Sequence, residues 1–143
     1  MKISSRAGRI EPFYVMEVAK AASAMARELA HTDAPMIFLN IGEPDFTAPP
    51  QVQEAAVRSI HDGATQYTQA TGLLTLRERI SGWYATRFGV DIPASRIVVT
   101  AGASAALQLA CLALIDVGDE ILMPDPSYPC NRHLVSAAEG APV

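Results

Sequence analysis

A turn of small residues between two apolar runs is the part of this sequence best suited to bind an anion. The run Ile97–Thr100 has the length of a strand, and a helical pattern begins at Ala103. The first amides of a helix have no partner within the helix, so they attract negative charge. Ser104 adds a hydroxyl group at the same place. The turn therefore predicts a phosphate site, although close packing of a helix on a strand favours the same small residues.

An aromatic side chain follows the next predicted strand. Tyr128 comes shortly after the run Glu120–Met123. A ring at Tyr128 and a phosphate site at Ser104 suit a ligand with a phosphate at one end and a flat aromatic system at the other. The turn contains one glycine, Gly102, and matches neither the dinucleotide-binding pattern nor the P-loop. A dinucleotide-binding half-domain, which would bind NAD saturably, gains little support from this glycine pattern.

Two further polar segments are candidates for chemistry. The segment NIGEPDF, residues 40–46, holds two carboxylates, Glu43 and Asp45, which suit either acid–base work or a solvated turn. The segment QYTQATG, residues 66–72, places Tyr67 in a polar loop before a helix. A tyrosine in such a loop is commonly a partly buried surface residue.

The composition is that of a globular protein with a core. Half of the 143 residues are apolar, 18% are charged, and the net charge is −4. This charge gives no reason to expect nucleic acid or an anionic membrane as a partner. The uncharged run Thr100–Ile115 is short for a membrane span, and the first residues lack a signal-peptide core. Cys111 and Cys130 form neither a disulfide framework nor a metal-ligand pattern, so we expect no metal and a cytoplasmic location.

The apolar spacing predicts an α/β protein. Two continuous apolar runs separated by a helix are typical of a parallel sheet that is covered on both faces. The expected strands are Met36–Ile41, Ile97–Thr100, Glu120–Met123 and another that begins after Gly140. The expected helices are Val15–Leu29, Val52–His61, Leu73–Phe88 between Gly72 and Gly89, Ala103–Ile115 and Pro129–Ala138.

In their order and spacing, four segments resemble the N-terminal part of a class I/II aminotransferase, a pyridoxal-phosphate enzyme of fold type I. The segments are NIGEPDF, YTQATGLLTLRERI, IVVTAGASAALQL and GDEILMPDPSYP. The resemblance extends from about Phe13 to the end of the chain. It implies the first part of a three-layer α/β/α large domain with an incomplete sheet. Residues 1–35 would form an arm and helix that belong to the small domain, and residues 36–143 the truncated large domain.

The resemblance also implies which residues bind the cofactor. Ala103, Ser104 and Ala105 would form a cup for the phosphate of pyridoxal phosphate, with the hydroxyl group supplied by Ser104. Tyr128 would stack on the pyridine ring. Tyr67 would reach across a homodimer interface to the phosphate of the partner subunit's cofactor. Family members often have other residues at positions 103 and 105. With alanine at both positions, this sequence keeps the backbone amides that donate to the phosphate but loses extra side-chain bonds to it.

For the substrates, the resemblance implies an amino acid and a 2-oxo acid between which an amino group is transferred. Gly42 would lie in the loop that holds the amino acid near its carboxylate. Phe13, Tyr14 and Val15 would belong to the arm that covers the substrate pocket, and their apolar character favours a non-acidic substrate side chain.

The family's cofactor-binding lysine is not among the matched segments. The chain has two lysines, Lys2 in the arm and Lys20 on the first helix, and neither lies in a family lysine motif. We therefore expect the catalytic lysine beyond Val143, no transamination by this chain alone, and weak or absent cofactor binding. The alternative is a non-catalytic association or dimerisation module derived from the same fold, because unpaired strand edges invite pairing with another chain.

Overall fold

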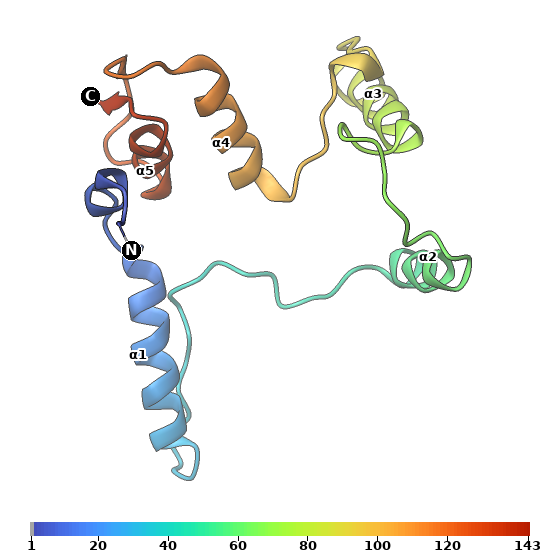
Figure 1. The fold of residues 1–143 in the computed structure, drawn as a ribbon. Coiled ribbons are helices and arrows are strands. Elements are labelled where there is room, and N and C mark those ends of the chain that lie inside the picture. Colours follow the sequence, from blue (N-terminus) through green and yellow to red (C-terminus); the bar gives the residue numbers. More distant parts are fainter. Residues whose placement is uncertain (1) are drawn as a thin grey trace. The chain divides into compact units, whose positions relative to one another are not determined.

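A computed structural model describes residues 2–143 and is mainly helical (Figure 1). Two compact units make up the chain: one contains residues up to Asp45 together with Leu107–Val143, and the other contains Phe46–Ala106. In chain order the elements are η1 (Ser5–Arg9), α1 (Tyr14–Leu29), α2 (Pro50–His61), α3 (Leu74–Phe88), η2 (Ala94–Arg96), α4 (Gly102–Leu114), β1 (Glu120–Ile121), α5 (Cys130–Ala137) and β2 (Ala141–Pro142).

The first unit contains a parallel β–α–β arrangement. Strands β1 and β2 pair in parallel, with Glu120 opposite Ala141, and α5 connects them. The backbone hydrogen bonds continue past β2, since Met123 N donates to Val143 O over 2.8 Å. Val135 on α5 is 4% exposed and forms the centre of the small core. The parallel pair and its connecting helix confirm the α/β class and the incomplete sheet.

A close approach of backbone to side chain occurs at Gly140, just before β2. A Cβ atom at this position would lie 2.7 Å from Ile115 Cγ2 and 3.1 Å from Val135 Cγ1. Contacts this short would force the core side chains to move. Glycine at position 140 is therefore what lets the chain pass from α5 into β2.

The second unit consists of α2, α3 and η2 with the loops between them. Helix α2 begins directly after Pro49, with Pro50 in its first turn, as expected for a ring that fixes φ where no amide donor is needed. Helix α3 ends at Gly89, whose left-handed backbone (φ 66°) closes the helix. Helix α3 packs against η2 within this unit.

All five predicted α-helices are present, with ends that differ by a few residues from the predicted ones. Two of the predicted strands are wrong: the segments 36–41 and 97–100 form no strand. A strand needs a neighbour that shares its ladder hydrogen bonds. Among the described residues, segment 97–100 makes one backbone hydrogen bond to another loop, from Val99 N to Thr71 O over 3.0 Å. One bond does not make a ladder.

The predicted division at residue 35, between a small-domain part and a large domain, stays a prediction. Among residues 2–143, no helix is both long and apolar enough to cross a membrane. No cluster of potential metal ligands occurs among the same residues.

Candidate functional site

The first unit brings two of the predicted site residues to one cavity. Gly42 follows the extended segment 36–41, and Tyr128 lies between β1 and α5. Both line a cavity of about 350 Å³ together with residues from the start of α1. The full lining is Phe13, Val15, Met16, Asn40, Ile41, Gly42 and Tyr128. Residues that the resemblance assigned to the substrate, the cofactor ring and the arm thus share one cavity.

Tyr128 contacts the arm through its ring. The rings of Phe13 and Tyr128 meet edge to face, with their centroids 6.0 Å apart. This geometry is the favourable one for two aromatic rings. The charge of the neighbouring Cys130, then burial, and then a hydrogen bond with Cys130 raise the pKa of Tyr128 above its usual value. The phenol therefore stays neutral near pH 7, and 58% of the residue remains exposed to a ligand.

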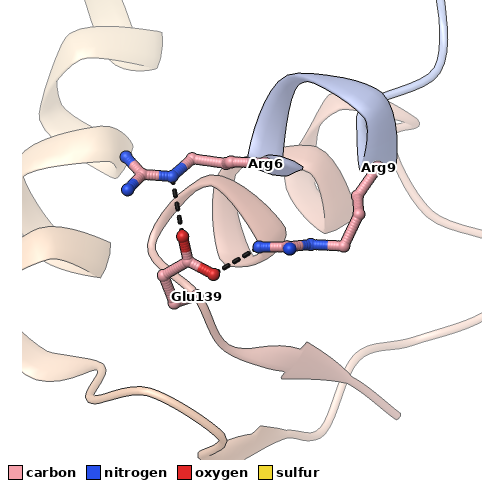
Figure 2. A network of polar contacts seen from close by, with 3 residues as sticks. All are labelled: Arg6, Arg9 and Glu139. Atoms are coloured by element: carbon pink, nitrogen blue, oxygen red, sulfur yellow. Dashed lines mark hydrogen bonds and ion pairs between the residues drawn. The ribbon is translucent and has the colours of Figure 1, made fainter. Parts of the chain in front are cut away.

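An ion-pair network fixes the arm that leads to this cavity (Figure 2). Arg6 Nε donates to Glu139 Oε1 over 2.8 Å, and Arg9 Nη2 donates to the other carboxylate oxygen, Oε2. The hydrogen bond from Arg6 lowers the pKa of Glu139, and the positive charges of Arg9 and Arg6 lower it further. Glu139 stands just after α5 with φ 68°, a left-handed backbone that is uncommon for a residue with a side chain. The network attaches η1 to the end of α5.

This network was not predicted from the sequence. Arg6 and Arg9 are one helical turn apart in the arm, which is the only local signal of a shared partner. Glu139 lies more than 100 residues further along the chain. No pattern in the sequence connects the half-buried glutamate before Gly140 with two arginines in the arm.

The predicted phosphate cup lies at the start of α4, in the second unit. Gly102 begins the helix with φ 82°, and the Thr100 hydroxyl donates to Gly102 O over 2.9 Å. The amides of the first helical turn lack partners within the helix. Ser104 is exposed, and the side chains at 103 and 105 are single methyl groups. The Gly102 amide donates to Thr100 O over 2.9 Å. The amides that follow it, beside a hydroxyl group, are a donor set that fits a phosphate.

Tyr67 also belongs to the second unit. It lies in the loop between α2 and α3, and its side chain is fully exposed. The predicted cofactor residues are therefore divided: Tyr128 belongs to the first unit, and Tyr67 and Ser104 belong to the second. The complete cofactor site stays a prediction.

Comparison with known proteins identifies the family. The family model "Aminotransferase class I and II" matches residues 34–143. The chain belongs to this family. It is 36% identical over 141 residues to the (5-formylfuran-3-yl)methyl phosphate transaminase of Methanocaldococcus jannaschii. This match covers 99% of this chain and 37% of that enzyme. It is 41% identical over 138 residues to a probable aspartate aminotransferase of the same organism, covering 96% of this chain and 34% of that protein.

Solved structures of aminotransferases share the fold. A crystal structure of an aminotransferase from Mycobacterium tuberculosis matches all of this chain with a TM-score of 0.89 and 36% identity, and the match covers 36% of that protein. The fold is that of the fold-type-I aminotransferases, with the sheet incomplete. The chain spans about a third of the length of the relatives it matches.

Proposed function

We propose that this chain supplies part of the active site of a pyridoxal-phosphate aminotransferase, which transfers an amino group between an amino acid and a 2-oxo acid. The observation that carries the proposal is the start of α4, where the first helical turn with the exposed Ser104 follows the left-handed Gly102. Membership of the aminotransferase family supports this assignment. The names of the relatives, among them transaminases for aspartate and for a phosphate ester, do not assign the substrate of this chain.

In this proposal the chain's own residues hold the two ends of the cofactor. The amides of Ala103, Ser104 and Ala105 and the Ser104 hydroxyl bind the phosphate group. Tyr128 stacks on the pyridine ring, and Tyr67 binds the phosphate of the cofactor held by the partner subunit of a homodimer. When bound, pyridoxal phosphate supplies the electron sink for bond breaking at the amino-acid α-carbon. The protein's part is to orient this group and to keep its charge balanced.

The cavity of the first unit is proposed to receive the amino-acid substrate. Gly42 has no atom within 4 Å of where a Cβ would stand, so its backbone is open to a ligand. Phe13 and Val15 line the same cavity from the arm side. Apolar groups at this position exclude water from the reacting carbon and favour a substrate with a non-acidic side chain.

The lysine that binds the cofactor covalently is proposed to lie outside this chain. Lys20 Nζ donates to Glu17 Oε1 over 2.6 Å on the exposed face of α1. The ammonium group of Lys20 is therefore paired with Glu17 at the surface, and it is not among the residues that line the cavity of Gly42 and Tyr128. Lys2 is exposed as well. Neither lysine is proposed to act in catalysis.

A second candidate function is a non-catalytic association module. The apolar side chains of α4 favour it, because Leu107, Leu109 and Leu112 are each between 45% and 58% exposed. Such a surface on a folded chain is typical of an interface. Sedimentation and the binding of a cofactor analogue together test this candidate. A non-catalytic module is expected to associate tightly and not to bind the analogue, and a strictly monomeric chain would contradict the module.

We also propose the cytoplasm as the compartment. Cys111 and Cys130 are both free thiols. Unpaired cysteines are usual where glutathione keeps thiols reduced.

The site assignment can be tested by nuclear magnetic resonance on the isotopically labelled chain. The probe is deoxypyridoxine phosphate, which has a methyl group in place of the cofactor's aldehyde and cannot react with Lys2 or Lys20. We expect weak binding, with a Kd on the order of 1 mM, and shifts at the amides of Ala103–Ala105. Ser104→Ala weakens these shifts, and Ser23→Ala, a change at an exposed serine of α1, leaves them unchanged. Shifts elsewhere in the chain, with none at α4, would refute the assignment.

A further inference from the structure

Arg77 has an environment unlike that of any other charged residue in the described part of the chain. It is 9% exposed, and within residues 2–143 it is the one charged side chain that is buried. A buried guanidinium group is costly unless its donors are satisfied. In this structure three of its nitrogens donate hydrogen bonds. The acceptors are Gly72 O at 3.1 Å, Ala94 O at 3.0 Å and Gln69 Oε1 at 2.9 Å.

The three acceptors come from both sides of α3. Gln69 and Gly72 belong to the loop that carries Tyr67, and Ala94 begins η2 after the end of the helix. One planar group on α3 therefore holds the chain that enters the helix and the chain that follows it. The rigid fork of an arginine can satisfy several acceptors at fixed angles, which a lysine cannot do.

The two segments also touch each other directly. Val99 N donates to Thr71 O over 3.0 Å. Gly72 has φ 92°, and a Cβ atom there would lie 2.7 Å from Val99 Cβ. The backbone of the Tyr67 loop is thus pressed against the segment that continues from η2 to Gly102. When Arg77 holds the Tyr67 loop, it therefore also holds the segment from η2 to Gly102.

We propose that Arg77 is a positioning residue for the phosphate site: it holds the loop of Tyr67 and the segment that leads to the start of α4 in one arrangement. The role of Arg77 in phosphate binding rests on the proposed function, because we assign Tyr67 and Ala103–Ala105 to phosphate groups. Its geometry rests on the contacts of Arg77 itself. Arg77 is not proposed to touch a ligand, and it acts through the backbone that it holds.

Amide hydrogen exchange on the chain tests the geometry. In Arg77→Gln we expect the Val99 and Gly72 amides to exchange about ten times faster or more, because both are bonded within the clamped segments. Arg79→Gln is the matched control, since Arg79 lies on the same helix but is exposed. The control should leave both amides unchanged. Equal exchange in the two variants would overturn the proposal.

A conservative variant keeps the test decisive if Arg77→Gln does not fold. Arg77→Lys retains the charge but has a single donor group in place of the fork. We expect the Val99 amide of Arg77→Lys to exchange several-fold faster than that of Arg79→Lys, with helix content by circular dichroism unchanged. Unchanged exchange at Val99 in folded Arg77→Lys would overturn the proposal.

The affinity for deoxypyridoxine phosphate tests whether Arg77 serves the phosphate site. If Arg77 had only a structural role, its replacement in a folded variant would leave this affinity unchanged. We expect folded Arg77→Lys to bind the probe at least three-fold more weakly than Arg79→Lys, as followed by the shift of the Ser104 amide. Equal affinities would show that the clamp does not serve the phosphate site and would overturn that part of the proposal. If the unmodified chain does not bind the probe at all, the proposed function fails, while the exchange experiment still decides the clamp.

Discussion

Arg6 and Glu139 lie 133 positions apart in the sequence, yet Arg6 Nε donates a hydrogen bond to Glu139 Oε1 over 2.8 Å (Figure 2). With Arg9 on the other carboxylate oxygen, this contact attaches η1 to the end of α5. The chain that follows η1 leads to Phe13, which meets Tyr128 edge to face. The exposed ion pair thus stands at the start of the arm that lines the cavity.

Neutralising Glu139 should loosen the arm. In Glu139→Gln the side chain keeps its size, but both arginines lose a charged acceptor. We expect the Ala7 amide, which donates to Ser4 O within η1, to exchange about two- to five-fold faster, because exposed ion pairs contribute only modestly. Glu120→Gln, a change at an exposed glutamate of β1, is the control. No change in arm exchange in Glu139→Gln would contradict the attachment of η1.

The same ion pair predicts a pH dependence. Arg6 and Arg9 lower the pKa of Glu139 in the folded chain, below its ordinary value of 4.5. The ionised carboxylate therefore stabilises the folded state above that value, and this contribution is lost as the pH falls toward the lowered pKa. Thermal unfolding of the unmodified chain and of Glu139→Gln, measured from about pH 3 to about pH 7, should show a constant difference near neutrality that shrinks in acid. A difference that grows as the pH falls would contradict the ion pair.

Adding a methyl group at Gly140 should destabilise the first unit. The new Cβ would stand 2.7 Å from Ile115 Cγ2 and 3.1 Å from Val135 Cγ1, so the core must shift. We expect Gly140→Ala to lower the free energy of unfolding by about 1–3 kcal/mol, the usual cost of overpacking. Gly82→Ala, inside α3 with open space around it, should instead raise it by about 0.5–1 kcal/mol. Urea unfolding of the two variants checks the opposite signs.

The chain by itself should not catalyse transamination. Its two lysines are exposed, and Lys20 is paired with Glu17. We expect the rate of 2-oxo-acid formation with pyridoxal phosphate and an amino acid to equal that of the free cofactor. Lys2→Arg and Lys20→Arg should leave this background unchanged. Turnover that disappears in either lysine variant would show that a catalytic lysine lies within the chain.

The helices could be predicted because their signals are local. The glycine that ends α3, Gly89, and the proline in the first turn of α2, Pro50, act within one turn of their helices. Segments 36–41 and 97–100 have strand-like sequences but form no strand, because strand formation depends on a partner and not on the segment itself. Gly42 and Tyr128 line a common cavity, and the roles that the family resemblance implied for them stay a prediction.

The contacts of charged side chains could not be predicted. Arg77 belongs to a helix rich in charged residues, and nothing in that pattern distinguishes it from the exposed Arg79. Its burial depends on the return of Ala94 after the helix ends. Glu139 meets Arg6 and Arg9 only because α5 and η1 pack together. Contacts of this kind follow from tertiary packing, which no local pattern encodes.

The proposed function depends on the binding of the phosphate of pyridoxal phosphate at the start of α4. A crystal structure of the chain soaked with deoxypyridoxine phosphate tests it most directly. We predict phosphate oxygens about 2.7–3.2 Å from the amides of Ala103–Ala105 and from the Ser104 hydroxyl. A phosphate group bound at another place, with these amides contacting only solvent, would contradict the claim.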